Sequence, residues 1–213
     1  MFRVIQAVAP AERREVFRLR HRICVEELDY AIPGSSPEEG LREDEDDHAL
    51  IFLALDGSRP AATIAINRWA DGPLSAATVA NYRLASFAER FGRASILVAR
   101  KLLVAKDYRA SPALFQVIDA ALDGARAPGQ LFLFLNCSPH LVGFYERLGC
   151  RRYAPPFLHE DGKELAAPMC MLLTDHEHLI RIRSPLVALI VRLYADTPGE
   201  RELLRAALDD QRP

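Results

Sequence analysis

The chain has 213 residues, half of them hydrophobic, which is enough to bury one sizeable core and suits one domain with an appendage. Its 27 basic and 29 acidic residues give a formal net charge of -2, so no overall positive field would attract nucleic acid. No stretch approaches the roughly 18 apolar residues that cross a bilayer, and the amino terminus lacks a secretory apolar core. We therefore expect a cytoplasmic protein.

The four cysteines give no sign of a metal site or of a disulfide framework. They lie far apart in the sequence, no two form a CxxC pair, and no histidines cluster with them: Cys24, Cys137, Cys150 and Cys170. Zinc sites and small disulfide-rich folds both show closely spaced cysteines. We expect neither here.

The amino-terminal segment predicts a helix followed by a loop. Within residues 10 to 28, Val16, Leu19 and Ile23 recur on one helical face. Residues 31 to 47 combine Pro, Gly and Ser with seven acidic residues, a composition typical of a surface loop. The helix is therefore expected to end before this loop begins.

Two apolar runs follow, at residues 49 to 55 and 61 to 68. The Asp56-Gly57 pair between them is a hairpin signal, so the two runs are expected to pair as antiparallel strands. A helix is expected next, within residues 71 to 94.

The middle of the chain predicts two strand and helix units. Residues 96 to 104 read as a buried strand that leads through a turn into a helix near residue 113. Residues 131 to 136 are apolar without alternation, which indicates a strand covered on both faces. Ser138 can cap the helix that follows, and Gly149 suits its end.

On this second helix, Leu141, Tyr145 and Leu148 share one stripe, so Tyr145 is expected to point inward. Two more strand candidates follow, at residues 151 to 157 and 168 to 174, joined by a turn at residues 159 to 164. From residue 175 onward the chain reads as helical, with breaks at Pro185 and Pro198.

This order of elements resembles the GNAT superfamily of acyltransferases. The segment VGFYERLGCRRY is similar to the superfamily's fYerlGF motif, with Cys150 in place of phenylalanine, and LLVAKDYRASPAL is similar to its donor-binding strand, loop and helix. The resemblance implies an α/β (α+β) fold: a mixed, mostly antiparallel central sheet with helices on both faces. It also implies a splayed pair of strands, at residues 97 to 104 and 131 to 136.

The resemblance gives Tyr145 a role in catalysis. Transfer of an acyl group from a thioester to an amine expels a thiolate, and Tyr145 matches the phenol that related enzymes use as the acid. Such assistance is typically worth about 10² to 10⁴ in rate. The alternative is a core tyrosine whose hydroxyl caps a backbone group. Cys137, beside this position, could be mistaken for a nucleophile, but GNAT transfer is usually direct.

The donor loop departs from the superfamily pattern because it has no glycine, although close approach of backbone N–H groups to a diphosphate favours glycine there. Arg109 and the helix start could hold one phosphate, whereas Pro112 lacks a donor. This favours an acyl carrier protein, with its single phosphate, over coenzyme A. The expected donor-binding residues are Leu103, Val104, Arg109, Ala110, Ser111, Ala113 and Asn136.

The amino-terminal half resembles acyl-homoserine lactone synthases and N-acyl amino acid synthases. Their first-helix arginine, following glutamate, D-x-x-D segment, hairpin arginine and E-x-x-R arginine imply these acceptor-side candidates: Arg20, Glu26 or Glu27, Asp44, Asp47, Arg68 and Arg100. The E-x-x-R glutamate is replaced by Leu97, which makes a homoserine lactone product less expected than an acyl amino acid. The plainer alternative is a solvated acidic loop and ordinary ion pairs.

The sequence thus predicts an N-acyltransferase that moves an acyl group from a carrier-protein or CoA thioester to a small-molecule amine, with no permanently bound cofactor and no metal. The alternatives are an acetyl-CoA-dependent acetyltransferase and a non-enzymatic module that binds an acyl ligand or a partner.

Residues 1 to 175 are expected to form the GNAT-like domain, and residues 176 to 213 a helical extension. The apolar run from Leu186 to Leu193 must be covered. We expect this extension to dock on its own domain, where it helps to wall the acyl pocket, or to pair in a homodimer. Contact with a membrane surface is the less favoured alternative.

Overall fold

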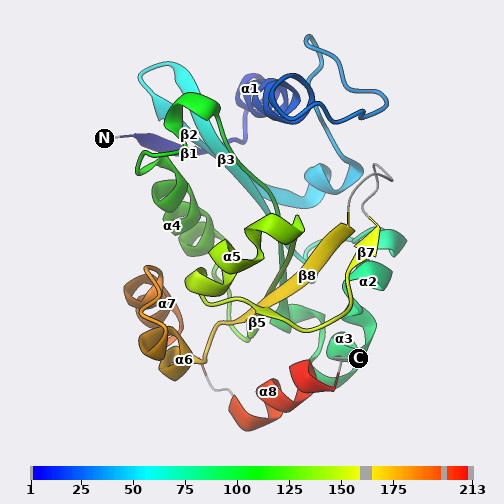
Figure 1. Cartoon of the computed structure of the whole chain (residues 1–213), viewed down its shortest axis with the longest axis vertical. Coiled ribbons are helices and arrows are strands. Elements are labelled where there is room, and N and C mark those ends of the chain that lie inside the picture. Colours follow the sequence, from blue (N-terminus) through cyan, green and yellow to red (C-terminus); the bar gives the residue numbers. More distant parts are fainter. Residues whose placement is uncertain (1, 159–164, 198–200, 211–213) are drawn as a thin grey trace. The chain divides into compact units, whose positions relative to one another are not determined.

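Residues 2–158, 165–197 and 201–210 are described by the structure, a computed structural model (Figure 1). The turn expected at residues 159 to 164 and the break expected at Pro198 lie outside these residues. The chain divides into two compact units. The first unit comprises Met1–Asn67 and Ala99–Ala125, and the second comprises Arg68–Val98 and Arg126–Pro213.

The described strands form one mixed, mostly antiparallel sheet of eight strands. Its pairing order is β1-β2-β3-β4-β5-β8-β6, and β7 also pairs with β8. The strands are β1 (Arg3–Gln6), β2 (Ala49–Asp56), β3 (Arg59–Arg68), β4 (Ile96–Val104), β5 (Phe132–Cys137), β6 (Arg151–Arg152), β7 (Phe157–Leu158) and β8 (Leu165–Leu172). The expected α+β class with a mixed sheet is confirmed.

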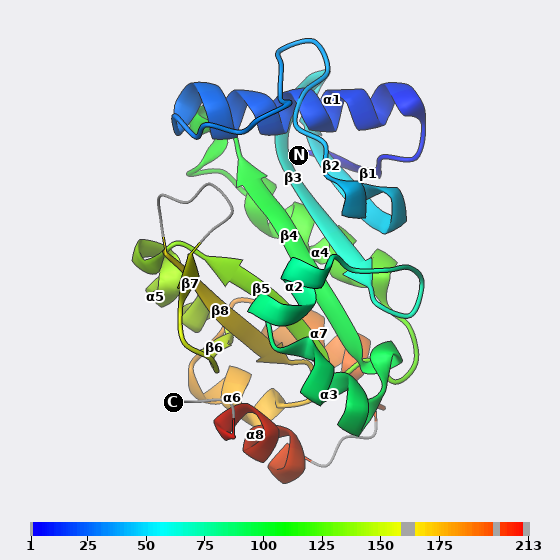
Figure 2. The same ribbon diagram turned by 90° about the vertical axis from the view of Figure 1, so that its right-hand side faces the viewer.

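In the first unit, helices cover both faces of the β1-β2-β3 sheet (Figure 2). α1 (Pro10–His21) buries Val16 and Leu19 in one cluster with Ile51 and Leu53 of β2. α4 (Ala113–Ala125) packs on β1 and β2. On that face a Cβ at Gly124 would lie 2.5 Å from the Phe52 ring, so glycine allows the close approach.

The acidic loop is more ordered than its composition predicts. Residues Asp44–His48 form a 3₁₀ helix (η2), and Glu45 and Asp46 within it are buried. Gly40 fixes the preceding turn against α1, because its φ of 78° is left-handed and a Cβ there would meet the Phe17 backbone. The expectation that residues 31 to 47 form a solvated surface loop is therefore wrong for this part of the segment.

In the second unit, the core includes a cluster of aromatic rings on one face of the sheet. Phe87 lies edge-on to Phe132, Phe134 and Tyr153, with ring centroids 4.9 to 5.8 Å apart. Such arrangements favour the edge-to-face contact of aromatic quadrupoles. Phe87 comes from α3 (Leu84–Phe91), so this helix covers that face.

Two expected elements of the second unit are divided. The single helix expected around residues 79 to 92 is a pair, α2 (Ala76–Asn81) and α3, separated at Arg83, whose φ of 50° ends the first helix. The strand expected at residues 151 to 157 is split into β6 and β7. Pro155 and Pro156 separate the two halves because proline has no N–H to donate to a ladder.

The carboxyl-terminal segment is helical, as expected, and packs within the second unit. It forms α6 (His176–Arg181), α7 (Val187–Tyr194) and α8 (Arg201–Asp209). Ile190 of α7 is fully buried, the Tyr194 hydroxyl donates to Gln130 Oε1 at 3.2 Å, and Leu208 of α8 joins the aromatic core. The apolar face of α7 is therefore covered by its own chain.

Asp175 joins several elements of this unit. It caps α6 by accepting the His178 N–H, and Arg151 Nη2 of β6 donates to its Oδ2 at 2.5 Å. Arg205 of α8 donates to both of its carboxylate oxygens. Burial raises the pKa of Asp175, but the hydrogen bonds from Arg205 and Arg151 outweigh burial and lower it below its usual range.

Candidate active site

The parallel ladder between β4 and β5 is short. It pairs Ile96 with Phe132 and ends at Val98 and Phe134, while both strands continue beyond these residues. In β4 the chain then passes through Lys101, whose φ of 49° is left-handed and costly for a residue with a side chain. Divergence of the two strands beyond this ladder stays a prediction.

In the second unit, Tyr145 follows β5 on a short helix. β5 ends at Cys137, a 3₁₀ turn covers Pro139–Leu141, and α5 runs from Val142 to Leu148. Gly149 ends α5 with a φ of 117°, and its N–H donates to the Tyr145 carbonyl at 3.2 Å. A Cβ at Gly149 would also meet the Leu179 side chain, so glycine fixes both the helix end and the packing behind it.

The surroundings of Tyr145 keep its phenol protonated. Burial raises the pKa of Tyr145, and the nearby Cys150 and Cys137 raise it further. Its ring lies edge-on to Phe144 at 5.2 Å, and among the described residues its hydroxyl has no hydrogen-bond partner. A protonated phenol with an unused donor can give a proton or a hydrogen bond to a bound ligand.

Cys137 lies close to Tyr145 but is poorly suited to act as a nucleophile. Burial, with a smaller contribution from Glu146, raises the pKa of Cys137 to about 11. Its Sγ lies 3.4 Å from the Met169 sulfur. Because the thiolate is the reactive form, this thiol is inert near neutral pH.

In the first unit, the loop after β4 is the donor loop of the sequence resemblance. It contains a 3₁₀ turn at Lys106–Tyr108 and leads into α4 at Ala113. Ser111 is held within the loop, since its hydroxyl donates to the Tyr108 carbonyl at 2.7 Å and accepts the Ala113 N–H at 3.3 Å. Ser111 thus already satisfies one of the free N–H groups at the start of α4.

Arg109, the basic residue of this loop, is half-exposed and ion-paired. Its Nη2 donates to Glu27 Oε2 at 2.5 Å, and its Nε lies 3.4 Å from the Val104 carbonyl. Leu103 and Val104 are half-buried at the end of β4, and Ala110 is exposed. In the second unit, Asn136 is half-buried in β5, opposite Pro168 of β8. Donor binding by these residues stays a prediction.

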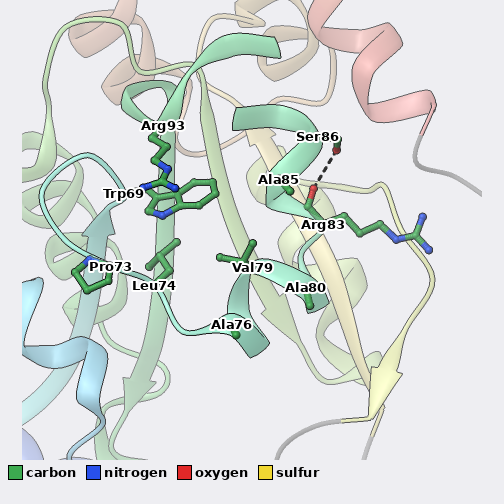
Figure 3. Close-up of a pocket in the computed structure, with 10 residues that line it drawn as sticks. All are labelled: Trp69, Pro73, Leu74, Ala76, Val79, Ala80, Arg83, Ala85, Ser86 and Arg93. Atoms are coloured by element: carbon green, nitrogen blue, oxygen red, sulfur yellow. Dashed lines mark hydrogen bonds between the residues drawn. The ribbon is translucent and has the colours of Figure 1, made fainter. Parts of the chain in front are cut away.

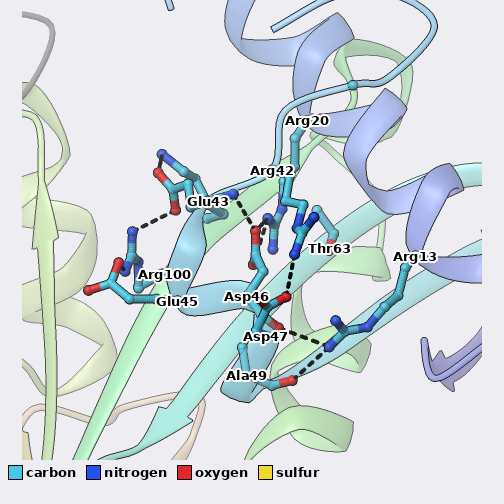
Figure 4. Close-up of polar contacts among 12 residues, drawn as sticks. Arg13, Arg20, Arg42, Glu43, Glu45, Asp46, Asp47, Ala49, Thr63 and Arg100 are labelled. Carbon is cyan, nitrogen blue, oxygen red and sulfur yellow. Dashed lines mark hydrogen bonds and ion pairs between the residues drawn. The ribbon is translucent and has the colours of Figure 1, made fainter. Parts of the chain in front are cut away.

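The first unit also holds a group of paired charges around η2 (Figure 4). Arg20 is fully buried, and its Nη1 donates to both carboxylate oxygens of Asp46 at 2.9 and 2.8 Å. The same carboxylate accepts the Glu43 N–H at 2.8 Å. Arg20 Nε and Nη2 have no partner among the described residues. Arg20 therefore retains two buried donors that a ligand or a water molecule would satisfy.

Arg100 and Lys101 of β4 take their carboxylate partners from the same turn. Arg100 Nη2 donates to Glu43 at 2.6 Å, Arg100 also pairs with Glu45, and Lys101 lies 2.8 Å from Glu43. Burial raises the pKa of Glu43, but Lys101 and Arg100 outweigh it and lower the pKa overall. Glu43 thus stays ionised.

The other acceptor-side candidates lie outside this group. Asp44 is exposed, and Asp47 is exposed and pairs with Arg42 at 2.6 Å. Glu26 is mostly exposed, 3.8 Å from His21. In the second unit, Arg68 pairs with Asp71 at 2.5 Å. Binding of an acceptor by these residues stays a prediction.

Sequence reasoning did not single out the acids that face inward, namely Glu43, Glu45 and Asp46. It aligned the family's D-x-x-D spacing with Asp44 and Asp47. The inward pair with the same spacing, Glu43 and Asp46, lies one residue earlier. One signal was present. Arg100 and Lys101 are adjacent cations on a buried strand whose E-x-x-R glutamate is missing, so acids from another segment had to pair with them.

A shallow apolar pocket lies in the second unit (Figure 3). It has a volume of about 750 Å³ and is lined by Trp69, Leu74 and Val79, with Arg83 and Arg93 beside them. The Arg93 guanidinium stacks on the Trp69 ring, 5.0 Å from its centroid. Its lining contains neither carboxylate nor histidine nor thiol among the described residues, so this pocket offers an apolar surface and no acid or base at neutral pH.

Two further absences hold for the described part of the chain. None of its helices is long and apolar enough to cross a membrane. Among the same residues, no three His, Cys, Asp or Glu side chains are grouped so that they could hold a metal ion.

No family model matches the chain, and no curated protein matches it by sequence. Solved structures do match. One is TofI, in a ternary complex with an inhibitor and MTA, with a TM-score of 0.64, 19% identity and coverage of 89% of this chain and 99% of TofI. Two further matches are synthases.

FeeM, an N-acyl amino acid synthase from uncultured soil microbes, matches with a TM-score of 0.62, 16% identity and coverage of 88% of this chain and 99% of FeeM. BjaI, a CoA-dependent acyl-homoserine lactone synthase solved with SAM and isopentyl-CoA, has a TM-score of 0.57 and 19% identity. The match covers 92% of this chain and 99% of BjaI. The chain therefore has the GNAT fold, and the N-acyl amino acid and acyl-homoserine lactone synthases are among the proteins that share it.

Proposed function

We propose that this protein is a GNAT-type N-acyltransferase that transfers an acyl group from a carrier-protein or CoA thioester to the amine of a small molecule such as an amino acid. The observation that carries the proposal is Tyr145, a phenol after β5 with a raised pKa and an unused hydroxyl donor. The shared fold with acyl-amide-forming synthases supports it.

In this reaction the acceptor amine attacks the thioester carbonyl, and the carbon–sulfur bond breaks to release a thiolate. The Tyr145 phenol donates its proton, or a hydrogen bond, to that sulfur as negative charge develops there. The attacking nitrogen loses one proton to water, and a phenol that has given up its proton regains one from water. The raised pKa of Tyr145 keeps this proton in place at neutral and mildly alkaline pH. The inert Cys137 thiol favours direct transfer over an acyl-enzyme intermediate.

For the donor, we propose that the pantetheine arm pairs with the backbone of β4, as an added strand would. Arg109 would hold the phosphate. The loop has no glycine, its Pro112 has no N–H, and Ser111 already takes the Ala113 N–H. These features favour the single phosphate of a carrier protein.

For the acceptor, we propose the charged group around η2. It contains three cations, Arg20, Arg100 and Lys101, and three carboxylates from Glu43, Glu45 and Asp46. A group with no net charge suits a zwitterion, whose carboxylate and ammonium groups each find an opposite charge. The unpartnered Arg20 Nε and Nη2 groups would donate to the carboxylate. The leucine at position 97 disfavours homoserine lactone chemistry.

The test is turnover of thioesters. Purified protein is given octanoyl-CoA or an octanoylated carrier protein with a panel of amino acids and other amines, and the release of thiol and the mass of the product are followed. An N-acyl product with equal thiol release supports the proposal. Binding of the thioester without turnover on any amine would support the non-enzymatic alternative instead.

A further inference from the structure

An anion of the chain itself occupies the donor loop. The Glu27 carboxylate accepts from Arg109 Nη2 at 2.5 Å through Oε2, and its Oε1 lies 3.4 Å from the Lys106 backbone N–H. The Glu27 side chain is only 18% exposed, so its carboxylate is largely shielded from water in this contact. Glu27 thus holds the Arg109 guanidinium, which the proposed function assigns to a phosphate.

The helix that carries Glu27 aims it at the loop. After α1, residues Arg22–Glu27 wind as a π-helix, in which the Leu28 N–H bonds the Ile23 carbonyl at 3.1 Å. Such wider turns are rare and are frequent at functional sites. The neighbouring Glu26 points elsewhere, is 54% exposed and lies 3.8 Å from His21. Of these two adjacent glutamates, therefore, Glu27 makes the contacts with the loop.

We propose that Glu27 determines donor specificity: it must leave Arg109 when a phosphate binds, and it thereby favours a donor with one phosphate charge over the diphosphate of coenzyme A. This inference rests on the proposed function, because it assumes that Arg109 binds the donor phosphate. Neither the sequence resemblance nor the pairing of Arg109 alone assigns such a role to Glu27.

The number of negative charges on each donor determines which donor Glu27 favours. A phosphodiester with one negative charge replaces the carboxylate beside Arg109, so one negative charge still lies next to the guanidinium. A diphosphate brings at least one more negative charge close to the displaced Glu27. Two like charges about 4 Å apart repel enough in water to change an affinity by about fivefold. Glu27 therefore penalises the more highly charged donor.

The experiment measures binding of three probes by calorimetry at low salt. Pantetheine carries no phosphate, the methyl phosphodiester of pantetheine carries one charge, and coenzyme A carries a diphosphate. The variant is Glu27→Gln, which keeps the size of the side chain and removes the charge. The matched control is Asp107→Asn, which removes one charge from the exposed turn of the same loop.

We expect Glu27→Gln to tighten binding of coenzyme A by about fivefold, that of the phosphodiester by about twofold, and that of pantetheine not at all. Asp107→Asn should change each affinity by less than twofold. In an Arg109→Ala background the Glu27→Gln change should have a smaller effect on coenzyme A, since no guanidinium then holds the diphosphate beside residue 27.

Equal affinities of wild type and Glu27→Gln for coenzyme A would overturn the inference. So would equal tightening of all three probes, which would show a general change of the loop, or an effect of Asp107→Asn as large as that of Glu27→Gln. None of the probes carries an acyl group, so the series gives its answer whether or not the protein turns over a thioester. Lack of turnover counts against the proposed function alone.

Discussion

Tyr145 is the residue on which the proposed reaction depends, because burial keeps its phenol protonated and its hydroxyl has no partner among the described residues. The FYERLG segment predicted a helix after a buried strand, and its Glu146 and Arg147 are exposed. Its raised pKa could not be read from the motif. That shift depends mainly on burial among the surrounding elements, with further contributions from Cys150, just after the helix, and from Cys137 of β5.

Replacement of Tyr145 by Phe removes one hydroxyl and little else. We expect kcat to fall by about 10 to 10³, with donor binding and the thermal midpoint nearly unchanged, because only acid assistance is lost. Steady-state kinetics with the best thioester and amine pair, together with thermal unfolding, would measure this. Unchanged turnover would return Tyr145 to the alternative of a core residue.

The lowered pKa of His178, on α6, leads us to expect that stability depends on pH. Burial and Arg151 lower the pKa of His178 to about 4, although Asp175 opposes them, and Arg181 and Arg205 lower it further. In the unfolded chain a histidine titrates near pH ~6.5. As the pH falls, the unfolded state takes up the proton first, so stability is lost between about pH 6.5 and pH 4.

Urea unfolding at pH 7.5 and pH 4.5 tests this prediction. Wild-type protein should lose more of its unfolding free energy between the two pH values than His178→Gln, which cannot be protonated. Asp175 acts in a lower window, because a lowered carboxylate pKa affects stability only below about pH 4. Equal losses in both proteins would mean that His178 is protonated as readily in the folded state as in the unfolded one.

At the scale of elements, hydrophobic periodicity predicted which helices and strands form better than it predicted where they end. The hairpin of β2 and β3 and the strands β4, β5 and β8 were all expected. The division between α2 and α3 was not, because it depends on one left-handed residue, Arg83, and no glycine marked the position. The inward acids of η2 were missed for a similar reason: only their pairing with Arg20, Arg100 and Lys101 distinguishes them from solvated neighbours.

α7 offers a matched pair of substitutions. Ile190 is fully buried, whereas Ile180 on α6 is 62% exposed. Ile190→Ala should lower the free energy of unfolding by about 3 kcal/mol, since it leaves a cavity among buried side chains. Ile180→Ala should change it by less than about 0.5 kcal/mol. Chemical denaturation of both variants would decide, and similar small effects would show that α7 is loosely packed.

For the whole molecule, the sequence predicted the fold but not the way the chain divides. The expected boundary at residue 175 separates a domain from an extension, and it stays a prediction. Each of the two compact units instead consists of two separate segments of the chain. The boundary falls within β4, which contributes Ile96–Val98 to the second unit and its remainder to the first. Such interleaving leaves no composition signal, since no linker marks it.

Deletion of residues 185 to 213 should give an aggregating or poorly folded protein. It removes Ile190 and Tyr194 from the core, and it takes Arg205 from the buried Asp175, which would keep an incompletely balanced charge. Size-exclusion chromatography and circular dichroism would measure the outcome. A truncated enzyme that stays folded and active, with unaltered chain-length preference, would show that these helices neither support the fold nor wall the acyl pocket.

The four cysteines are free and buried, so the rate at which each thiol is alkylated reports local opening of the structure around it. Burial raises the pKa values of Cys24 and Cys137, so alkylation must await a local opening that exposes each thiol. Cys24 lies in the first unit and the other three in the second. Rates of iodoacetamide labelling, resolved by mass spectrometry, would therefore reveal whether the two units open in concert or independently, without any engineered probe.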